Sequence, residues 1–418
     1  MKTFYLGRNR TMRDYTITTE IFTKIKKTYI MNILLDFIPF QYAGGIGGAA
    51  SFTYRITEEL LRNRGEHALF AMYDSQLSDG KLYSYEEIAM KNNIILIDRA
   101  SNPHIHITLD NNHIDVWFIA IAQFYAEYEL KNITCKTIMF IHDIFDIERN
   151  DTHIDLMTMF SNHISKKECF KRLFNVITGR WQRRSKKWYQ NILPLYLSPK
   201  TVSYTVSNYT KESLKYYFKD LRKKDIRICY SPLKNVKLSP NIENQPLSKL
   251  IESSKPYIMM IAADREYKNA NLLLNVFSKL KNDFPDLTLL TLHYGKVINS
   301  QHIDIPLLND SDLEYAYMHT KALVFPSFFE GFGYPPIEAL KYNTPTVASN
   351  VTSIPEILDD TGIYFSPFYP ADLYRALRYV LGTYKKDVEK MEGRLAYIQN
   401  RQKEDLQSLI KEIFTQKI

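Results

Sequence analysis

The chain has 418 residues, 45% of them hydrophobic and 24% charged, which is typical of a soluble globular protein large enough for two domains. Its formal net charge of +8 favours acidic partners such as nucleotides or an anionic lipid surface, although charge alone selects none of them. Three unpatterned cysteines argue against a disulfide framework or a zinc site, and no apolar run approaches the roughly 20 residues of a transmembrane helix. With no signal peptide apparent, we expect a cytoplasmic protein that contacts membranes, if at all, only peripherally.

The chain begins with a polar and basic extension, residues 1–30, to which we assign no function. A strand is predicted over 31–38 and a helix over 49–64. Between them, the sequence Gly45-x-Gly47-x-x-Ala50 satisfies the dinucleotide-binding fingerprint. That fingerprint expects the strand to lead directly into the first glycine, whereas a proline-containing stretch intervenes here. The alternative at this point is a tight turn with no ligand.

Further apolar segments alternate with helical stretches and predict a parallel α/β sheet. These segments are residues 67–72, 93–97, 114–121 and 137–141. The last one ends in His142-Asp143. Polar residues just past the carboxyl end of a parallel strand lie where open α/β sheets bind ligands, although a single histidine there is more often structural.

The segment 165–195 is basic and aromatic. Nine lysines and arginines lie between Lys166 and Lys187, and apolar residues that include Phe170, Trp181 and Trp188 fall close to one helical face. The simpler interpretation is a helix, kinked at Gly179, that packs on the N-terminal domain. The alternative is an amphipathic surface that rests on anionic lipid and suits a lipid-linked acceptor. We expect no nucleic-acid partner, because no recognised nucleic-acid module accompanies the charge.

A strand over 201–207 and a helix capped by Ser207-Asn208 follow, and then a polar, proline-bearing linker over 236–255. The second domain opens with a strand over 257–262. Arg265 and Lys268 come in the loop between this strand and the helix 272–280. Cations in that position can neutralise a diphosphate and stabilise a leaving group, although a solvent-exposed pair is the default interpretation from charge alone.

Residues 322–340 predict a strand, a glycine loop and a helix N-terminus. The apolar run 322–325 is followed by Gly331 and Gly333, which allow positive φ and close approach to a ligand, and two prolines suit the first helical turn. Glu330 lies in the loop and Glu338 near the start of the helix. Two acids at a helix N-terminus oppose a bare phosphate but suit the hydroxyls of a sugar or a ribose.

The arrangement Glu330-x7-Glu338, followed by residues 344–349 and by Ile354-Pro355-Glu356, resembles the retaining nucleotide-sugar glycosyltransferases of family four, also called glycosyl transferases group 1. The resemblance is specific over 257–372. It implies the GT-B fold, in which two Rossmann-like α/β domains face each other across a cleft. We expect an N-terminal acceptor-side domain over 31–235, a nucleotide-sugar-binding domain over 256–395, and a helix over 396–418 that packs back on the first domain.

The resemblance also implies roles for individual residues. The residues that it implies to be catalytic are Glu330, His142, Lys268 and Arg265. The donor-binding residues are Gly45, Ile46, Gly47, Lys268, Arg265, Leu308, Glu330, Gly331, Phe332, Gly333, Tyr334 and Glu338, with the glycine loop of the first domain facing the donor phosphates. Asp143 and Ser207 are placed on the acceptor side. The chain departs from the family's H-D-x-x-P element, because Phe145-Asp146 stands where the proline would come, and Tyr267 stands where many relatives have a basic residue.

We therefore expect a retaining glycosyltransferase that moves a sugar from a nucleotide-sugar donor to a glycan, lipid-linked or protein-linked acceptor in the synthesis of cell-surface polysaccharide or glycoconjugate. No Asp-x-Asp motif accompanies the donor site, so we expect neither a metal nor another cofactor. The alternatives are a non-catalytic GT-B protein that binds a nucleotide or a partner, and a nucleotide-sugar epimerase. The sequence does not specify the base, the sugar, the acceptor or the oligomeric state.

Overall fold

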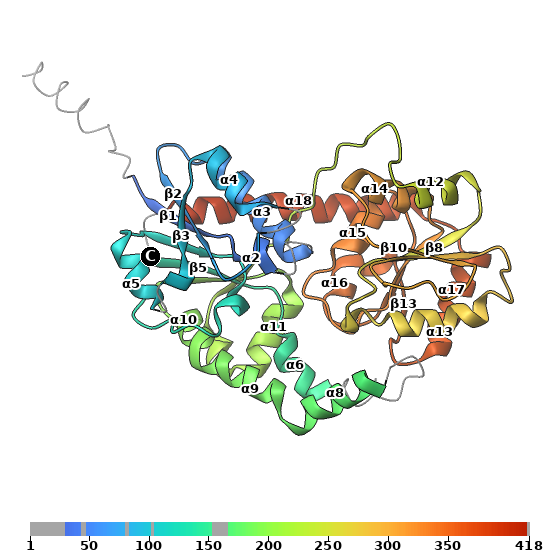
Figure 1. Ribbon diagram of the computed structural model, residues 1–418, viewed down its shortest axis with the longest axis horizontal. Helices are drawn as coiled ribbons and strands as arrows, with labels where there is room; N and C mark the ends of the chain where they lie inside the picture. Colours follow the sequence, from blue (N-terminus) through green and yellow to red (C-terminus); the bar gives the residue numbers. More distant parts are fainter. Residues whose placement is uncertain (1–29, 43–46, 80–82, 102–103, 153–165, 416–418) are drawn as a thin grey trace, which may run out of the picture.

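The computed structural model describes residues 30–42, 47–79, 83–101, 104–152 and 166–415. The chain forms two α/β domains side by side, and one long helix, α18 (Val388–Ile413), runs along both of them (Figure 1). The predicted extension 1–30 lies, apart from residue 30, outside the described residues.

The N-terminal domain is built on a parallel sheet of seven strands in the order β3-β2-β1-β4-β5-β6-β7. The strands are β1 (Asn32–Asp36), β2 (Ala68–Tyr73), β3 (Ile95–Asp98), β4 (Val116–Ile119), β5 (Lys136–Ile141), β6 (Thr201–Thr205) and β7 (Ile226–Ile228). Every residue of the central strands β4 and β5 is buried, which follows from helices covering both faces of a parallel sheet.

The helices of this domain divide its core into two layers. They are α2 (Ile38–Gln41), α3 (Gly48–Arg62), α4 (Tyr85–Asn92), α5 (Ile105–Asn111), α6 (Phe145–Thr152), α8 (Lys166–Ile177), α9 (Arg180–Lys187), α10 (Leu193–Leu197) and α11 (Asn208–Tyr217), with short turns η2 (Arg99–Ser101), η3 (Ala122–Tyr125), the π-helix η4 (Trp188–Ile192) and η5 (Lys219–Lys223). One layer contains Phe52 and Phe140 and continues into α18 through Ile398, whereas the other contains Trp117 and Trp188.

The C-terminal domain has a parallel sheet of six strands in the order β10-β9-β8-β11-β12-β13. The strands are β8 (Tyr257–Met260), β9 (Thr288–Leu292), β10 (His302–Ile305), β11 (Ala322–Phe325), β12 (Thr346–Ser349) and β13 (Gly362–Phe365). Its helices are α12 (Gln245–Glu252), η6 (Glu266–Lys268), α13 (Ala270–Leu280), α14 (Asp310–His319), α15 (Tyr334–Leu340), α16 (Ile354–Leu358), η7 (Asp359–Thr361) and α17 (Pro370–Gly382). The two sheets confirm the predicted pair of Rossmann-like domains.

The structure corrects the predicted linker. Residues 236–255 include helix α12, whose N-terminus is capped by the Asn244 side chain, which accepts a hydrogen bond from the N–H of Leu247 at 3.0 Å. A proline in the first turn starts this helix rather than preventing it, because the missing N–H would have no helical partner there. Leu247 and Leu250 are buried in the core of the second domain.

The terminal helix also begins earlier than predicted. Asp387 caps α18 by accepting from the N–H of Lys390, and the helix continues without interruption to Ile413. Near its beginning, Arg394 donates to the carbonyl of Ile357 in the second domain at 2.8 Å. Near its end, Glu412 pairs with Arg227 of the first domain at 2.7 Å. Helix α18 therefore joins the two domains, as the predicted return to the first domain required.

The basic aromatic segment divides at Gly179, where φ is +60°, as the predicted kink required. After the break, Trp188, Ile192 and Leu195 are buried in the first domain, which confirms the packing interpretation for this half. Before the break, Phe170, Phe174 and Ile177 are 70%, 57% and 74% exposed on α8. No helix within the described ranges is long and apolar enough to cross a membrane.

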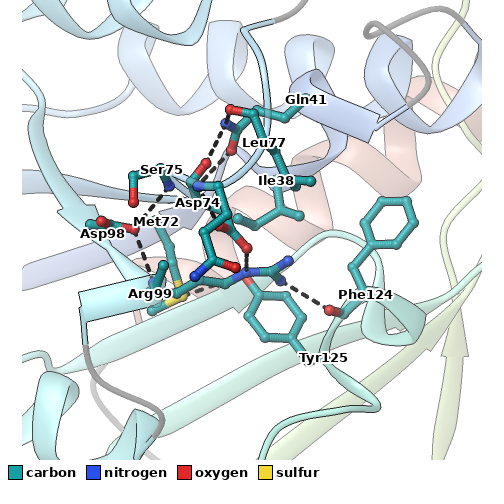
Figure 2. Close-up of polar contacts among 12 residues, drawn as sticks. Ile38, Gln41, Met72, Asp74, Ser75, Leu77, Asp98, Arg99, Phe124 and Tyr125 are labelled. Atoms are coloured by element: carbon teal, nitrogen blue, oxygen red, sulfur yellow. Dashed lines mark hydrogen bonds and ion pairs between the residues drawn. The ribbon is translucent and has the colours of Figure 1, made fainter.

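A buried polar network ties together the carboxyl ends of the first three strands (Figure 2). Arg99 donates to Asp74 at 2.8 Å and to the carbonyl of Phe124 at 2.9 Å. Asp36 accepts from the hydroxyl of Tyr125 and from the N–H of Ala120 and Ile121. These bonds are internal to the domain, so we interpret the network as structural: it holds the strand-end loops from which the glycine segment emerges.

Candidate functional site

The glycine loop between β11 and α15 has the predicted form. Gly333 precedes α15 with a φ of +101°, a backbone conformation that residues other than glycine rarely adopt. Pro335 and Pro336 occupy the first turn of the helix. Ser353 supports the loop, because its hydroxyl lies 3.0 Å from the carbonyl oxygens of both Glu330 and Phe332. Glu330 and Glu338 therefore project from a rigid loop and from the helix that follows it.

Lys268 and Glu330 form a buried ion pair. Lys268 Nζ lies 2.6 Å from Glu330 Oε1, and the two side chains are 7% and 10% exposed. Lys268 ends the short turn η6, where Asn269 adopts φ of +60° and redirects the chain into α13. The predicted cation and the predicted loop acid, 62 positions apart in the sequence, are thus brought into direct contact.

Arg265 lies across the domain interface against the first domain's glycine segment. A Cβ placed on Gly47 would lie 2.9 Å from Arg265 Nη2, and one placed on Gly48 would lie 3.0 Å from the Tyr334 ring. Gly47 is the N-cap of helix α3 and Gly48 its first residue, so Arg265 and Tyr334 lie beside the N-terminus of this helix. Gly45 and Ile46 lie outside the described residues.

Glu338 and Leu308 lie on the nucleotide side of the predicted donor site. The Tyr317 hydroxyl donates to Glu338 Oε2 at 2.6 Å, and burial raises the pKa of Glu338 above its usual value. Leu308 is buried between β10 and α14. The contacts of both residues with a nucleotide stay predictions.

The His142 side chain is held within the first domain. Its Nε2 lies 3.0 Å from the carbonyl oxygen of Ala120, and its ring meets that of Phe52 edge-on at 4.6 Å. Because a carbonyl can only accept, Nε2 carries the proton. Burial lowers the pKa of His142 to about 3, so the ring is neutral at physiological pH and is no general acid there. Its predicted position near the donor sugar stays a prediction.

The backbone of His142 makes the tightest contact with the glycine loop. A Cβ on Gly331 would lie 2.1 Å from the His142 carbonyl oxygen, where no atom fits. Gly331 is therefore a glycine because the second domain approaches the first domain's backbone at this point, and not because of its own backbone angles.

Asp143 lines a pocket of about 140 Å³ between the domains, together with Glu330 and Gly331. Burial, and then the neighbouring acids Asp146, Glu148 and Glu330, raise the pKa of Asp143 to about 6. Ser207 is fully buried, and its hydroxyl accepts from the N–H of Thr210, which confirms the predicted helix cap. The next residues, Tyr209 and Thr210, line the pocket instead, so an acceptor contact by Ser207 itself stays untested.

Glu356 joins the two domains, a role that its position in the sequence does not indicate. Its carboxylate accepts from the backbone N–H of Asn208 at 2.7 Å and of Tyr209 at 2.8 Å, at the N-terminus of α11. Helices α16 and α11 face each other at the centre of the molecule (Figure 1). A second bridge pairs Arg149 of α6 with Glu266 of η6 at 2.9 Å. The Ile-Pro-Glu helix start predicted an acid in the first turn but not its partner in the other domain.

Glu148 is a further buried acid at the site that the sequence did not single out. It lies on α6, is 5% exposed, and accepts from the Tyr209 hydroxyl at 2.9 Å. Across the described segments, no three histidine, cysteine, aspartate or glutamate side chains gather in a way that could hold a metal ion. Metal independence itself stays a prediction.

Comparison with known proteins places the second domain in a family. Residues 241–397 match the model of Glycosyl transferases group 1. The chain is 48% identical to O-antigen chain mannosyltransferase B of Escherichia coli over 58 residues, which are 14% of this chain and 15% of that protein. It is 25% identical to O-antigen chain mannosyltransferase RfbU of Salmonella typhimurium over 185 residues, 37% of this chain and 51% of that protein. The chain thus spans about half the length, or less, of these two curated relatives.

The fold is similar to that of Anabaena Alr3699/HepE, whose crystal structure contains UDP and glucose. The TM-score is 0.60 at 12% sequence identity, and the similarity covers 92% of this chain and 99% of the other. At this identity the likeness concerns the fold alone. Residues 241–397 thus match the glycosyl transferases group 1 family, and the chain has the two-domain GT-B fold with two parallel sheets.

Proposed function

We propose that the chain is a retaining glycosyltransferase that moves a sugar from a nucleotide-sugar donor to a hydroxyl of a glycan, lipid-linked or protein-linked acceptor in the synthesis of cell-surface polysaccharide. One observation carries the proposal. Arg265 lies at the N-terminus of α3 and Lys268 contacts Glu330 of the acidic loop, so groups suited to a diphosphate meet groups suited to a sugar. The names of the two curated relatives favour mannose as the transferred sugar.

The donor is proposed to use the ion pair of Lys268 and Glu330 as an exchangeable contact. A diphosphate would draw Lys268 toward its oxygens, with Arg265 and the N-terminus of α3 adding positive charge. Glu330 would then be free to accept hydrogen bonds from the donor sugar. Glu338, held by Tyr317, would accept from the ribose hydroxyls. Each hydrogen-bond donor that stabilises a developing negative charge, as in an oxyanion hole, contributes about 3 kcal/mol.

We propose that the acceptor attacks from the face that the diphosphate leaves. The bond from the anomeric carbon to the phosphate oxygen breaks, the bond to the acceptor oxygen forms on the same face, and the acceptor proton passes to the departing phosphate. In this scheme Glu330 binds the donor sugar and is not a covalent nucleophile. This scheme retains the anomeric configuration and uses the two cations where a metal would otherwise neutralise charge.

A thermal-shift panel tests the donor site. UDP, GDP, ADP, CMP and dTDP, with sugar nucleotides that include GDP-mannose, are compared on the wild type and on Glu338→Ala. A ligand at 100 times its dissociation constant stabilises by about 2.7 kcal/mol. We expect one nucleotide class to shift the wild type and not the variant. Absence of any shift in folded protein would favour a non-catalytic role, whereas a new sugar nucleotide formed without acceptor would favour an epimerase.

Product analysis tests the reaction. The anomeric proton signal of the first product formed should have the configuration of the donor, and EDTA should leave the rate unchanged. Inversion of configuration would refute front-face attack, and loss of activity in EDTA restored by a divalent cation would refute metal independence.

We further propose that α8 rests on an anionic bilayer, so that the protein is cytoplasmic and membrane-peripheral. Phe170, Phe174 and Ile177 recur at helical spacing on one exposed face, and the exposed side chains of Lys166 and Lys171 accompany them. Helix α8 lies at the edge of the molecule, away from both sheets (Figure 1).

Vesicle pelleting at low salt tests this surface. Phosphatidylglycerol vesicles should retain the protein more strongly than phosphatidylcholine vesicles, and replacing Phe170 and Phe174 by serine should abolish the preference. The matched control is Met90→Ser on α4, which is 81% exposed. Equal pelleting with the two lipids would refute the proposal.

A further inference from the structure

The lining of the pocket between the domains differs from the residues predicted to meet the nucleotide. Its lining includes Glu330 and Gly331 of the second domain and Glu148 and Tyr209 of the first domain. Glu338 and Leu308, the residues predicted to meet the nucleotide, are not among its lining residues. Its volume of about 140 Å³ is close to that of an apolar cavity that binds benzene, about 150 Å³. A single sugar ring beyond the donor is therefore a suitable occupant.

One side of the pocket is aromatic. The Phe145 ring meets the Phe329 ring edge-on at 4.6 Å and lies 5.8 Å from the Tyr267 ring. Phe145 comes from the first domain and the other two from the second, so this wall is complete only when the domains are together. Aromatic faces offer a large apolar surface for the C–H face of a pyranose ring.

The other lining residues include acids and hydrogen-bonding groups. Asp143, Glu148 and Glu330 line the pocket, and the Tyr209 hydroxyl donates to Glu148 at 2.9 Å. Carboxylates accept short, strong hydrogen bonds from sugar hydroxyls. The hydroxyl of Tyr209 fixes the position of one Glu148 oxygen and can itself accept a bond.

Two cations near the pocket are paired with acids, and a third, Arg265, donates to the hydroxyl of the lining residue Tyr267 at 3.2 Å. Lys268 is paired with Glu330, and Arg149 is paired with Glu266, so neither adds uncompensated positive charge to the pocket wall. An anionic sugar such as a uronate or a sugar phosphate would meet the carboxylates of Asp143 and Glu148, and such like-charge contacts reject ligands.

We propose that this pocket is the subsite for the terminal acceptor residue, that it selects a neutral pyranose over an acidic one, and that Glu148 and Tyr209 hold one of its hydroxyls. The assignment rests on the proposed transferase function, because it needs a donor sugar at Glu330. Asp143 and Glu148 supply the discrimination against charge, and the three aromatic rings supply the apolar contact.

The test uses the full chain with the nucleotide sugar that the thermal-shift panel identifies. Methyl glucoside and methyl mannoside are compared with methyl glucuronide as acceptors, in the wild type, Glu148→Gln and Tyr209→Phe. We expect the glucuronide to have at least about tenfold lower kcat/KM than the glucoside. Each variant should raise the acceptor KM by about tenfold and leave the donor KM and the slow hydrolysis of donor without acceptor unchanged.

Matched controls come from the exposed face of the neighbouring helix. Glu212→Gln removes a carboxylate and Tyr216→Phe a phenol from α11, and neither side chain lines the pocket. Both should behave as the wild type.

Donor hydrolysis and donor-induced thermal shift report the proposed function, whereas the acceptor KM reports the pocket. Equal use of glucuronide and glucoside, or a normal acceptor KM in both pocket variants, would overturn this assignment while leaving the transferase function intact. If no sugar nucleotide is bound or hydrolysed, the function and the acceptor assignment fall together.

Discussion

Replacing Glu356 by glutamine should weaken the contact between the two domains. The carboxylate belongs to α16 of the second domain, yet it accepts two backbone N–H groups at the N-terminus of α11 in the first domain, at 2.7 and 2.8 Å. The Tyr230 hydroxyl donates to the same group at 2.9 Å. A negative charge there also faces the positive end of the α11 dipole.

The magnitude follows from the two carboxylate oxygens. Glutamine keeps one acceptor oxygen, but its NH₂ group must face either the N–H of Tyr209 or that of Asn208, where donor meets donor. A hydrogen bond to a charged group contributes about 1.5–3 kcal/mol, and the lost dipole interaction about 0.3–1 kcal/mol. Because Asn208 is exposed, water compensates in part, and we expect a net loss of about 1–2 kcal/mol, a factor of about 5–30.

Donor affinity and domain separation measure this loss. Calorimetric titration with the nucleotide that binds the wild type should show a dissociation constant raised about 5–30-fold in Glu356→Gln. Small-angle scattering should show a larger radius of gyration than in the wild type. The control is Glu404→Gln, an exposed acid on α18. Wild-type affinity together with an unchanged radius of gyration would refute the assignment of Glu356 as the contact that favours domain closure.

Three further predictions concern the site. Gly331→Ala should lower donor-dependent activity by about tenfold or more with little change in the unfolding free energy. The reason is that the alanine Cβ would lie 2.1 Å from the His142 carbonyl oxygen in the other domain. Full activity of the variant would contradict this contact. Burial lowers the pKa of His142 from 6.5 to about 3, so between these pH values the unfolded chain binds a proton that the folded chain does not, and the unfolding free energy falls as the pH drops. Urea unfolding at several pH values should show a smaller fall in His142→Gln than in the wild type. An equal pH dependence in the two proteins would contradict this prediction. Lys268→Ala and Glu330→Ala, made singly and together, should show a coupling of about 1–3 kcal/mol in unfolding free energy, and additive effects would refute the buried pair.

The local form of the donor loop could be predicted from the sequence. An apolar run, a glycine with positive φ at 333 and two prolines specify a strand, a turn and a helix start by backbone preference, and β11 and α15 have that form. The Ser207 cap and the break at Gly179 were predicted for the same reason. A local pattern is ambiguous where one residue type occurs in two structures: the proline of α12 suggested a linker but starts a helix. The short strands β10 and β13 were not predicted.

Only the tertiary structure decided which of these elements meet. Sequence spacing describes which side chains share a face of one helix or strand, but carries no distance between residues that different strands position. Glu356 and Asn208 are 148 positions apart, and the Lys268–Glu330 pair spans 62. The apolar stripe before and after Gly179 reads alike in sequence, yet Trp188 is buried and Phe170 exposed, because only the second half reaches the sheet. Residue types and local backbone determined the chemistry available to the chain, and the docking of the two domains determined where that chemistry comes together.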